Sequence, residues 1–197
     1  MPIMLSLLRG EVHEPSYAAL LSNLLAIYAV LEPALDRHSQ HPSLSWIAAS
    51  ALRRAATLRA DLAALPGGVL RAEGAVVPAT LAYVERLKAI DGSNPRLLVA
   101  HAYVRYLGDL SGGQLLKRAV SDNARLGVPA PVSFYHFGDA ITTAALVLAF
   151  REGLASIKPA PLDEDAILAE AKHAFELHIA IFDQLSPPST FELLAAV

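Results

Sequence analysis

The chain of 197 residues contains no cysteine. This absence excludes disulfide bonds, thiolate catalysis, iron–sulfur clusters and cysteine-based zinc sites, and the simplest expectation is a cytoplasmic protein. Strong charge of either sign is also missing, because the formal net charge is -3 at pH 7 and no long run of one sign occurs. A nucleic-acid-binding surface is therefore not expected, and a small molecule or another protein is the expected partner.

Long uninterrupted hydrophobic runs are missing too, although 54% of the residues are hydrophobic. The most apolar segments are residues 18–35, interrupted by Asn23 and Glu32, and residues 140–150, which are too few to span a bilayer. Both are interpreted as buried core helices, so no membrane association is expected. The first residues have no basic start and no small-residue cleavage site, and they do not resemble a signal peptide.

Strand-like alternation, internal repeats and low-complexity tracts are absent from the sequence, and apolar residues recur at helical spacing. The expected fold is all-α, a single multi-helix domain over residues 1–197 whose tail after about residue 187 is loosely attached. Proline, glycine and capping residues divide the chain into six predicted helices. These helices cover residues 15–37, 43–65, 78–91, 94–126, 139–157 and 163–185.

The stretch YLGDLSGGQLLKR, residues 106–118, places three glycines inside the fourth predicted helix. Each interior glycine destabilises a helix by about 1 kcal/mol relative to alanine, so another interaction must offset this effect. Gly108 and Gly112 lie four residues apart on one helix face, and Gly113 extends the bare surface. Two interpretations stay open. Either another helix packs on the glycines or the helix bends there, which is the commoner use of such a motif, or a flat ligand lies on the exposed backbone.

Polar side chains surround this bare surface. Asp109 follows the first glycine, and Arg105, four residues earlier, is a suitable ion-pair partner. Tyr103, Tyr106 and Gln114 add hydrogen-bonding groups that could organise water beside a ligand. The residues alone therefore predict a site for a flat ligand with an acidic neighbour.

The segment LLVAHAYVRYLGDLSGGQLLKR, residues 97–118, closely resembles the distal-helix signature of heme oxygenases. Three further blocks resemble the same family in the same order, at residues 7–35, 133–138 and 170–185. The resemblance implies the all-α heme oxygenase fold with a glycine-rich, kinked distal helix. It also implies oxidative cleavage of heme to biliverdin, with release of iron and carbon monoxide.

The resemblance further implies roles for individual residues. The implied catalytic residues are Asp109, Arg105 and Tyr28. Asp109 would hold a water network that helps to protonate the iron-bound peroxide, and the other two would belong to this network. The implied heme-binding residues are three glycines whose backbone lies over the heme plane, two residues near the propionates and two that line the pocket: Gly108, Gly112, Gly113, Tyr103, Arg151, Phe175 and Phe182.

The same resemblance implies the cofactor and the partners. Heme is expected as both substrate and cofactor, and no flavin or nucleotide site is evident. An external reductase or ferredoxin is expected to supply electrons, and a phytochrome is a candidate acceptor of the biliverdin.

Heme oxygenases hold the heme iron through a proximal histidine, and a gapless alignment of residues 4–32 places that position before Met1. His13 is the nearest histidine and the candidate metal ligand, although a solvated turn histidine is its commoner interpretation. His101 and His178 lie on apolar helices and are interpreted as hydrogen-bonded core histidines. Three explanations stay open: the chain begins at an internal methionine of a longer gene, which we favour; the first helix is absent in a variant that binds heme weakly; or another histidine binds iron.

Two other functions stay open beside heme oxygenase activity. The first is a non-catalytic heme or tetrapyrrole-binding protein of the same fold, because the proximal histidine is not in the chain. The second is a helical protein of the wider fold superfamily with an unrelated metal or small-molecule reaction.

Overall fold

The computed structural model describes residues 2–47, 50–65, 76–127, 129–158 and 161–186, and the expected loose tail after residue 187 lies outside these ranges. All regular elements within these ranges are helical, which confirms the all-α prediction. The α-helices are α1 (Pro2–Leu8), α2 (Glu14–Arg37), α3 (Ala55–Ala64), α4 (Pro78–Ser93), α5 (Leu98–Ala102), α6 (Gly108–Ser121), α7 (Ala140–Ser156) and α8 (Pro161–Leu185). The short turns are η1 (Ser45–Ile47), η2 (Ser50–Leu52), η4 (Pro95–Leu97), η5 (Tyr103–Leu107), η6 (Ala124–Leu126) and η7 (Ser133–Tyr135), of which η5 is π-helical.

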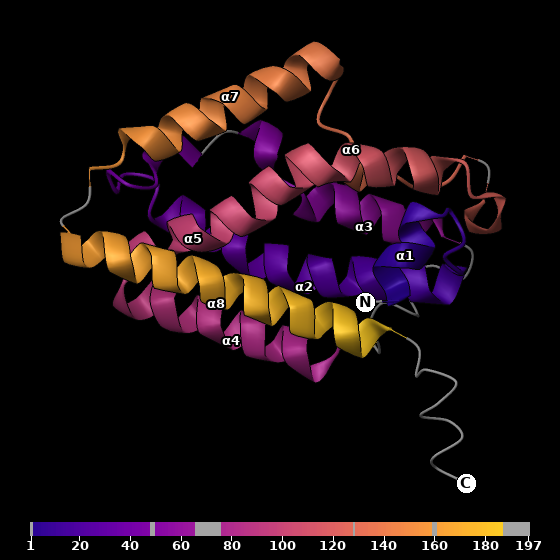
Figure 1. The fold of residues 1–197 in the computed structure, drawn as a ribbon, viewed down its shortest axis with the longest axis horizontal. Coiled ribbons are helices and arrows are strands. Elements are labelled where there is room, and N and C mark those ends of the chain that lie inside the picture. The colour runs from indigo at the N-terminus through magenta and orange to yellow at the C-terminus, as the bar shows by residue number, and fades with distance from the viewer. Residues whose placement is uncertain (1, 48–49, 66–75, 128, 159–160, 187–197) are drawn as a thin grey trace, which may run out of the picture.

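Helix α2 forms the centre of the molecule and contacts α3, α4, α5 and α8 (Figure 1). Pro15 stands in its first turn, where a missing N–H is tolerated because that group has no partner inside the helix. The helix is long and apolar enough to cross a membrane, but 67% of its most apolar window is buried inside the structure. This burial agrees with the interpretation of residues 18–35 as part of a core helix.

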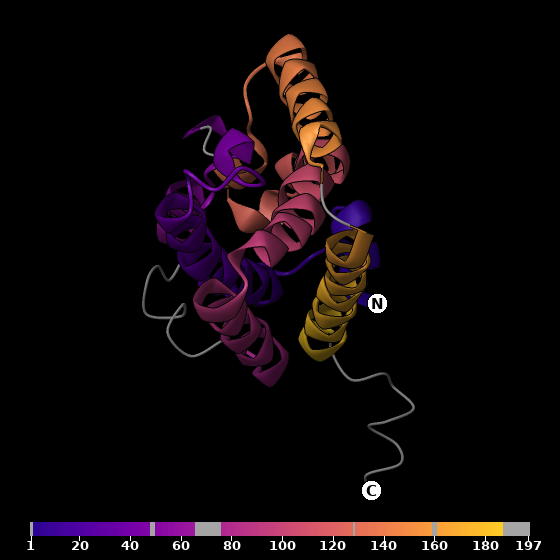
Figure 2. The same ribbon diagram turned by 90° about the vertical axis from the view of Figure 1, so that its left-hand side faces the viewer.

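Helices α4 and α8 pack side by side along one side of the bundle, whereas α7 extends away from it (Figures 1 and 2). Among the described residues, the contacts of α7 are chiefly with α6 and η1. Trp46 of η1 lies edge-on to Phe150 of α7, with ring centroids 4.9 Å apart. This aromatic contact anchors α7 at the edge of the core.

The second predicted helix, residues 43–65, is wrong over its first half. The structure has the turns η1 and η2 there, and α3 begins only at Ala55. The carboxylate of Glu32, which lies on α2 more than 20 residues earlier in the chain, accepts hydrogen bonds from the backbone N–H groups of Arg54 and Ala55. Because a carboxylate that binds free N–H groups stabilises a helix start, this tertiary contact sets the beginning of α3.

The fourth predicted helix, residues 94–126, is also wrong in its continuity. It is divided into η4, α5, the π-helical turn η5 and α6, and it ends at Ser121. Single π-helical turns inserted into α-helices produce local bends. The π-helical turn η5 ends before the glycines, so the bend is expected there and not at the glycines. Gly112 and Gly113 themselves lie in regular α-helix.

No helix is predicted before residue 15, whereas the structure has α1 at residues 2–8. Ile3 and Leu7 lie four residues apart and are both buried, and α1 contacts α6 and α8. Gly10 ends this segment with a positive φ of 65°, and a Cβ atom there would lie 2.9 Å from the Ala119 carbonyl oxygen. A seven-residue helix depends on such packing, because isolated helices of this length are not stable.

Candidate functional site

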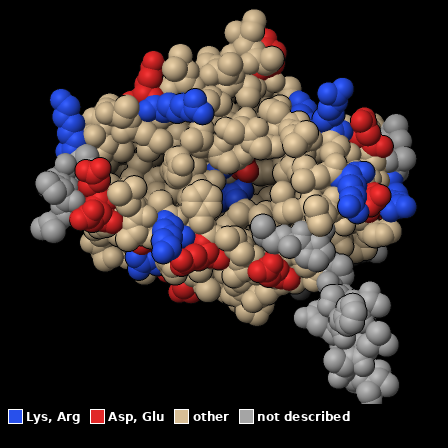
Figure 3. Space-filling view, in the orientation of Figure 1, with Lys and Arg blue, Asp and Glu red and all other residues tan. Residues whose placement is uncertain are grey.

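A cavity of about 220 Å³ lies between α1, α2, η5, α6, η7 and α8. Its lining is mostly apolar, with a small group of polar side chains: Met4, Leu7, Leu20, Leu24, Val104, Arg105, Gly108, Asp109, Gly112, Gly113, Leu116, Phe134, Tyr135, Phe175, His178 and Phe182. Figure 3 shows a hollow near the centre of one face, with a few acidic and basic atoms at its bottom and uncharged residues around it. Apolar walls with a few convergent polar groups are typical of a small-molecule site.

The glycines of α6 face this cavity. A Cβ atom added at Gly108 or at Gly112 would meet no other atom within 4 Å, and at Gly113 it would lie 3.3 Å from the Tyr135 ring. Close packing of a helix against Gly108 and Gly112 is therefore the wrong interpretation of the motif. The bare backbone is instead available to a ligand.

Asp109 lies beside the glycines and is held from two directions. The Tyr28 hydroxyl donates a hydrogen bond to Oδ2, and Nη2 of Arg105 lies 3.0 Å from Oδ1. The expected Arg105–Asp109 ion pair is thus present, and both side chains are largely buried. Burial raises the pKa of Asp109, while the Arg105 charge and the Tyr28 hydroxyl oppose this rise because both favour the carboxylate. A buried carboxyl with a raised pKa is suited to proton transfer.

Tyr28 reaches Asp109 from α2 inside an aromatic cluster. Its ring is fully buried, and its centroid lies 5.6 Å from that of Tyr106 and 6.1 Å from that of Phe134. Burial and the nearby Asp109 charge raise the pKa of Tyr28 well above its ordinary value. Tyr28 therefore stays protonated and acts as a hydrogen-bond donor.

Phe175 and Phe182 of α8 line the cavity, as expected for apolar pocket residues. Sequence reasoning missed His178, which was interpreted as a core histidine but lines the same cavity between them. The signal was present in the spacing, because positions three and four residues apart lie on one helix face. His178 follows Phe175 by three residues and precedes Phe182 by four.

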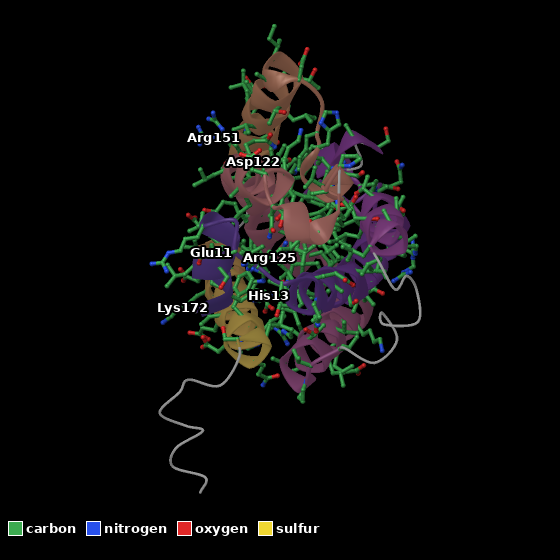
Figure 4. All side chains as sticks on the ribbon, turned by 90° about the vertical axis from the view of Figure 1, so that its right-hand side faces the viewer. Glu11, His13, Asp122, Arg125, Arg151 and Lys172 are labelled. Atoms are coloured by element: carbon green, nitrogen blue, oxygen red, sulfur yellow. The ribbon has the colours of Figure 1, made fainter. Side chains whose placement is uncertain are left out.

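Three expected site residues lie outside the cavity lining. Tyr103 lines a neighbouring cleft between α5, α7 and α8, although its ring meets Phe175 with centroids 6.4 Å apart. Arg151 is exposed on the projecting helix α7, and His13 is exposed at the start of α2 (Figure 4). The structure therefore does not bring His13 to the glycines as a metal ligand.

His101 is a hydrogen-bonded core histidine, as expected. Its Nδ1 lies 3.0 Å from the Tyr83 hydroxyl, and its Nε2 lies 2.9 Å from Oε1 of Glu170, which also binds Arg86. Burial raises the pKa of Glu170, but the Arg86 and His101 contacts outweigh this effect and lower it to about 2. This cluster ties α4 and α5 to α8.

Glu170 and His173 carry the Glu-x-x-His spacing of di-iron helices, once in the sequence. A di-iron centre of that kind needs two such motifs. Glu170 is occupied by His101 and Arg86, whereas His173 points to Glu176 at 3.7 Å. No group of three metal-ligating side chains occurs among the described residues, so the structure gives no support to an unrelated di-iron reaction.

Known proteins match this chain over almost its whole length. The family model for heme oxygenase matches residues 1–184. Heme oxygenase 1 of Nostoc sp. is 37% identical over 178 residues, which cover 90% of this chain and 75% of the relative. The crystal structure of heme oxygenase-1 from the cyanobacterium Synechocystis in complex with heme is 33% identical and matches with a TM-score of 0.83, covering 97% of this chain and 84% of that one.

A second Synechocystis structure, heme oxygenase-2 in complex with heme and NO, has a TM-score of 0.84 at 33% identity and covers 91% of this chain and 75% of that one. The sequence match, the fold and the glycine-rich cavity agree with one another. The chain belongs to the heme oxygenase family.

Proposed function

We propose that this protein is a heme oxygenase, which cleaves heme to biliverdin and releases iron and carbon monoxide with dioxygen and external electrons. One observation carries the proposal beyond family membership. The buried Asp109 carboxylate, held by Tyr28 and Arg105, stands beside the bare backbone of Gly108 and Gly112 at the wall of one apolar cavity. A flat ligand and a proton-transfer group can therefore share this site.

The chemical character of the cavity lining suits heme. The phenylalanine rings of α8 and the apolar side chains of α1 and α2 would pack on the macrocycle, and the glycine backbone would lie against its face. The bound heme supplies the iron that activates dioxygen. The residues of this chain would orient the heme and hold a proton at the Asp109 carboxyl group.

The present volume of about 220 Å³ lies below the range of about 300–1,000 Å³ that is usual for small-molecule pockets. Bound heme would therefore extend beyond this cavity to its rim. Tyr103 and Arg151 would then approach the propionates from the rim, where a cation provides charge-assisted hydrogen bonds.

The whole chain acts as one helical domain in the cytoplasm. A reductase or ferredoxin donates the electrons, and a phytochrome is a candidate acceptor of the biliverdin. A purely binding role is not favoured, because the family model and the relatives that match most of this chain are those of heme oxygenases.

The test is a turnover assay with the purified protein, hemin and either ascorbate or a ferredoxin with its reductase. We expect loss of the Soret band and formation of biliverdin, identified by its absorption spectrum and mass. A parallel assay contains added imidazole, which would supply a nitrogen ligand to the iron. Heme binding without biliverdin in both assays would favour the non-catalytic alternative.

A further inference from the structure

His178 of α8 lines the cavity and contacts Arg105, but it has no role in the proposed function. Both of its ring nitrogens lie 3.1 Å from Nη1 of Arg105. The ring is fixed on its other side by Phe182, whose centroid lies 4.3 Å away at an interplanar angle of 77°. A ring held in this way is a rigid acceptor for the guanidinium.

We propose that His178 is a positioning residue: its unprotonated ring nitrogen accepts a hydrogen bond from Nη1 of Arg105, and this contact keeps Nη2 of the same guanidinium on Asp109. The inference rests on the proposed function for what Asp109 does in catalysis. The geometry of the three side chains does not depend on it.

The hydrogen bonds of Arg105 show why a second anchor matters. Nη2 binds Asp109 at 3.0 and 3.3 Å, Nη1 meets His178, and the buried Nε has no partner among the described residues. An arginine side chain has many rotamers, and ordering it is entropically unfavourable unless its donors are engaged. Without His178, Nη1 would lose its acceptor, and Asp109 would be the remaining hydrogen-bond partner of the guanidinium among the described residues.

The contact requires a neutral imidazole, because a nitrogen that accepts from Arg105 cannot carry a proton. Burial lowers the pKa of His178 well below its ordinary value, and the Arg105 charge lowers it further. The groups around the ring are consistent with this state. Arg105 faces it from η5 with Asp109 behind, and the cavity residues contributed by α1 and α2 are apolar.

The contact between His178 and Arg105 depends on pH. When acid protonates His178, two cations face each other, so the ring must release Arg105. Product formation should therefore decline on the acid side as His178 titrates. This decline at acid pH, the acid limb of the pH profile, would be caused by protonation of His178. It should disappear when a neutral side chain that does not titrate replaces the histidine.

The test compares His178→Gln, which keeps a neutral acceptor, with His178→Leu, which keeps the bulk alone. His173→Leu, on the exposed side of the same helix, is the matched control. We expect biliverdin yield to fall about tenfold in His178→Leu, the lower end for a lost hydrogen bond to a charged group. In His178→Gln, yield should stay near that of the unchanged protein and the acid limb should be absent.

A second measurement uses the heme-free protein, so that it is independent of turnover. Nitrogen-15 NMR of the histidine side chains should show His178 still neutral below pH 6.5, the ordinary pKa of an imidazole, and Arg105→Gln should raise the pKa of His178. An ordinary His178 titration that Arg105→Gln does not change would overturn the inference, as would equal losses in the Gln and Leu variants. If the NMR result holds but the unchanged protein makes no biliverdin, the contact is supported and the proposed function fails.

Discussion

The Tyr28 hydroxyl of α2 donates a hydrogen bond to Asp109 of α6, although the two residues are 81 positions apart in the chain. This bond joins the central helix of the core to the glycine-rich wall of the cavity. Both groups are buried, so the hydrogen bond between them replaces the hydrogen bonds that each would otherwise make to water. The stability of the fold and the state of the proposed proton-transfer group are therefore linked at one contact.

Tyr28→Phe should lower both stability and activity. It removes one donor from a buried carboxylate, and an unsatisfied buried group typically costs about 1–3 kcal/mol of unfolding free energy. Denaturant titration measures this loss, and the hemin assay measures the yield of biliverdin. Tyr17→Phe is the matched control, because Tyr17 is equally buried on α2 but donates to the Pro131 carbonyl. It should lower stability while leaving the yield per folded molecule unchanged.

Asp109→Asn should leave hemin affinity nearly unchanged and reduce biliverdin yield by about 100-fold or more, as expected for loss of a proton-transfer group. The amide keeps the shape of the carboxyl group but cannot act as a general acid or base. Hemin titration at the Soret band and quantitation of biliverdin measure the two effects. Asp122→Asn, at the exposed end of the same helix, serves as the control. An unchanged yield in Asp109→Asn would remove Asp109 from the mechanism.

Gly112→Ala should stabilise the fold, while Gly112→Leu should weaken hemin binding. No atom lies within 4 Å of an added Cβ, so alanine gains about 1 kcal/mol from helix propensity. A leucine side chain would occupy the space of a flat ligand and lower affinity by about tenfold or more, given typical overpacking energies of about 1–3 kcal/mol.

The control for Gly112 is Gly92 on α4, where an added Cβ also meets no atom within 4 Å and which is not among the cavity-lining residues. Gly92→Leu should leave hemin affinity unchanged. If Gly112→Leu behaves in the same way, the ligand does not lie on the glycine backbone.

The fold should lose stability in acid as the Glu170 carboxylate becomes protonated. Its pKa is lowered in the folded state from 4.5 to about 2, so between these values the unfolded chain binds more protons than the folded one. The stabilisation is present above about pH 4.5 and is lost as the pH falls toward 2. Glu170→Gln should remove this pH dependence in denaturant titrations, whereas Glu176→Gln on the exposed face of α8 should retain it.

Gly153→Ala should loosen α7. A Cβ atom at this position would lie 2.2 Å from the Trp46 ring, and such overpacking typically costs about 1–3 kcal/mol. Trp46 is the single tryptophan of the chain, so its fluorescence emission should shift toward that of an exposed indole. Unchanged emission and an unchanged unfolding midpoint would show that α7 is not anchored through this contact.

The sequence by itself determined the features that depend on local spacing. Residues four apart on a helix are neighbours whatever the helix packs against, so the Arg105–Asp109 pair and the shared face of Gly108 and Gly112 could be predicted. The positions of most helices followed for the same reason, since proline, glycine and apolar periodicity act within a few residues. The family resemblance extended this local information to the proposed roles.

Only the tertiary structure decided which groups from distant segments meet. Glu32 sets the start of α3, Tyr28 reaches Asp109, and His178 holds Arg105 across 73 positions. Such contacts depend on how whole helix faces pack together to bury their apolar surface, and no spacing along the chain encodes them. The same packing left open space beside Gly108 and Gly112, which turned an ambiguous glycine motif into the wall of a ligand cavity.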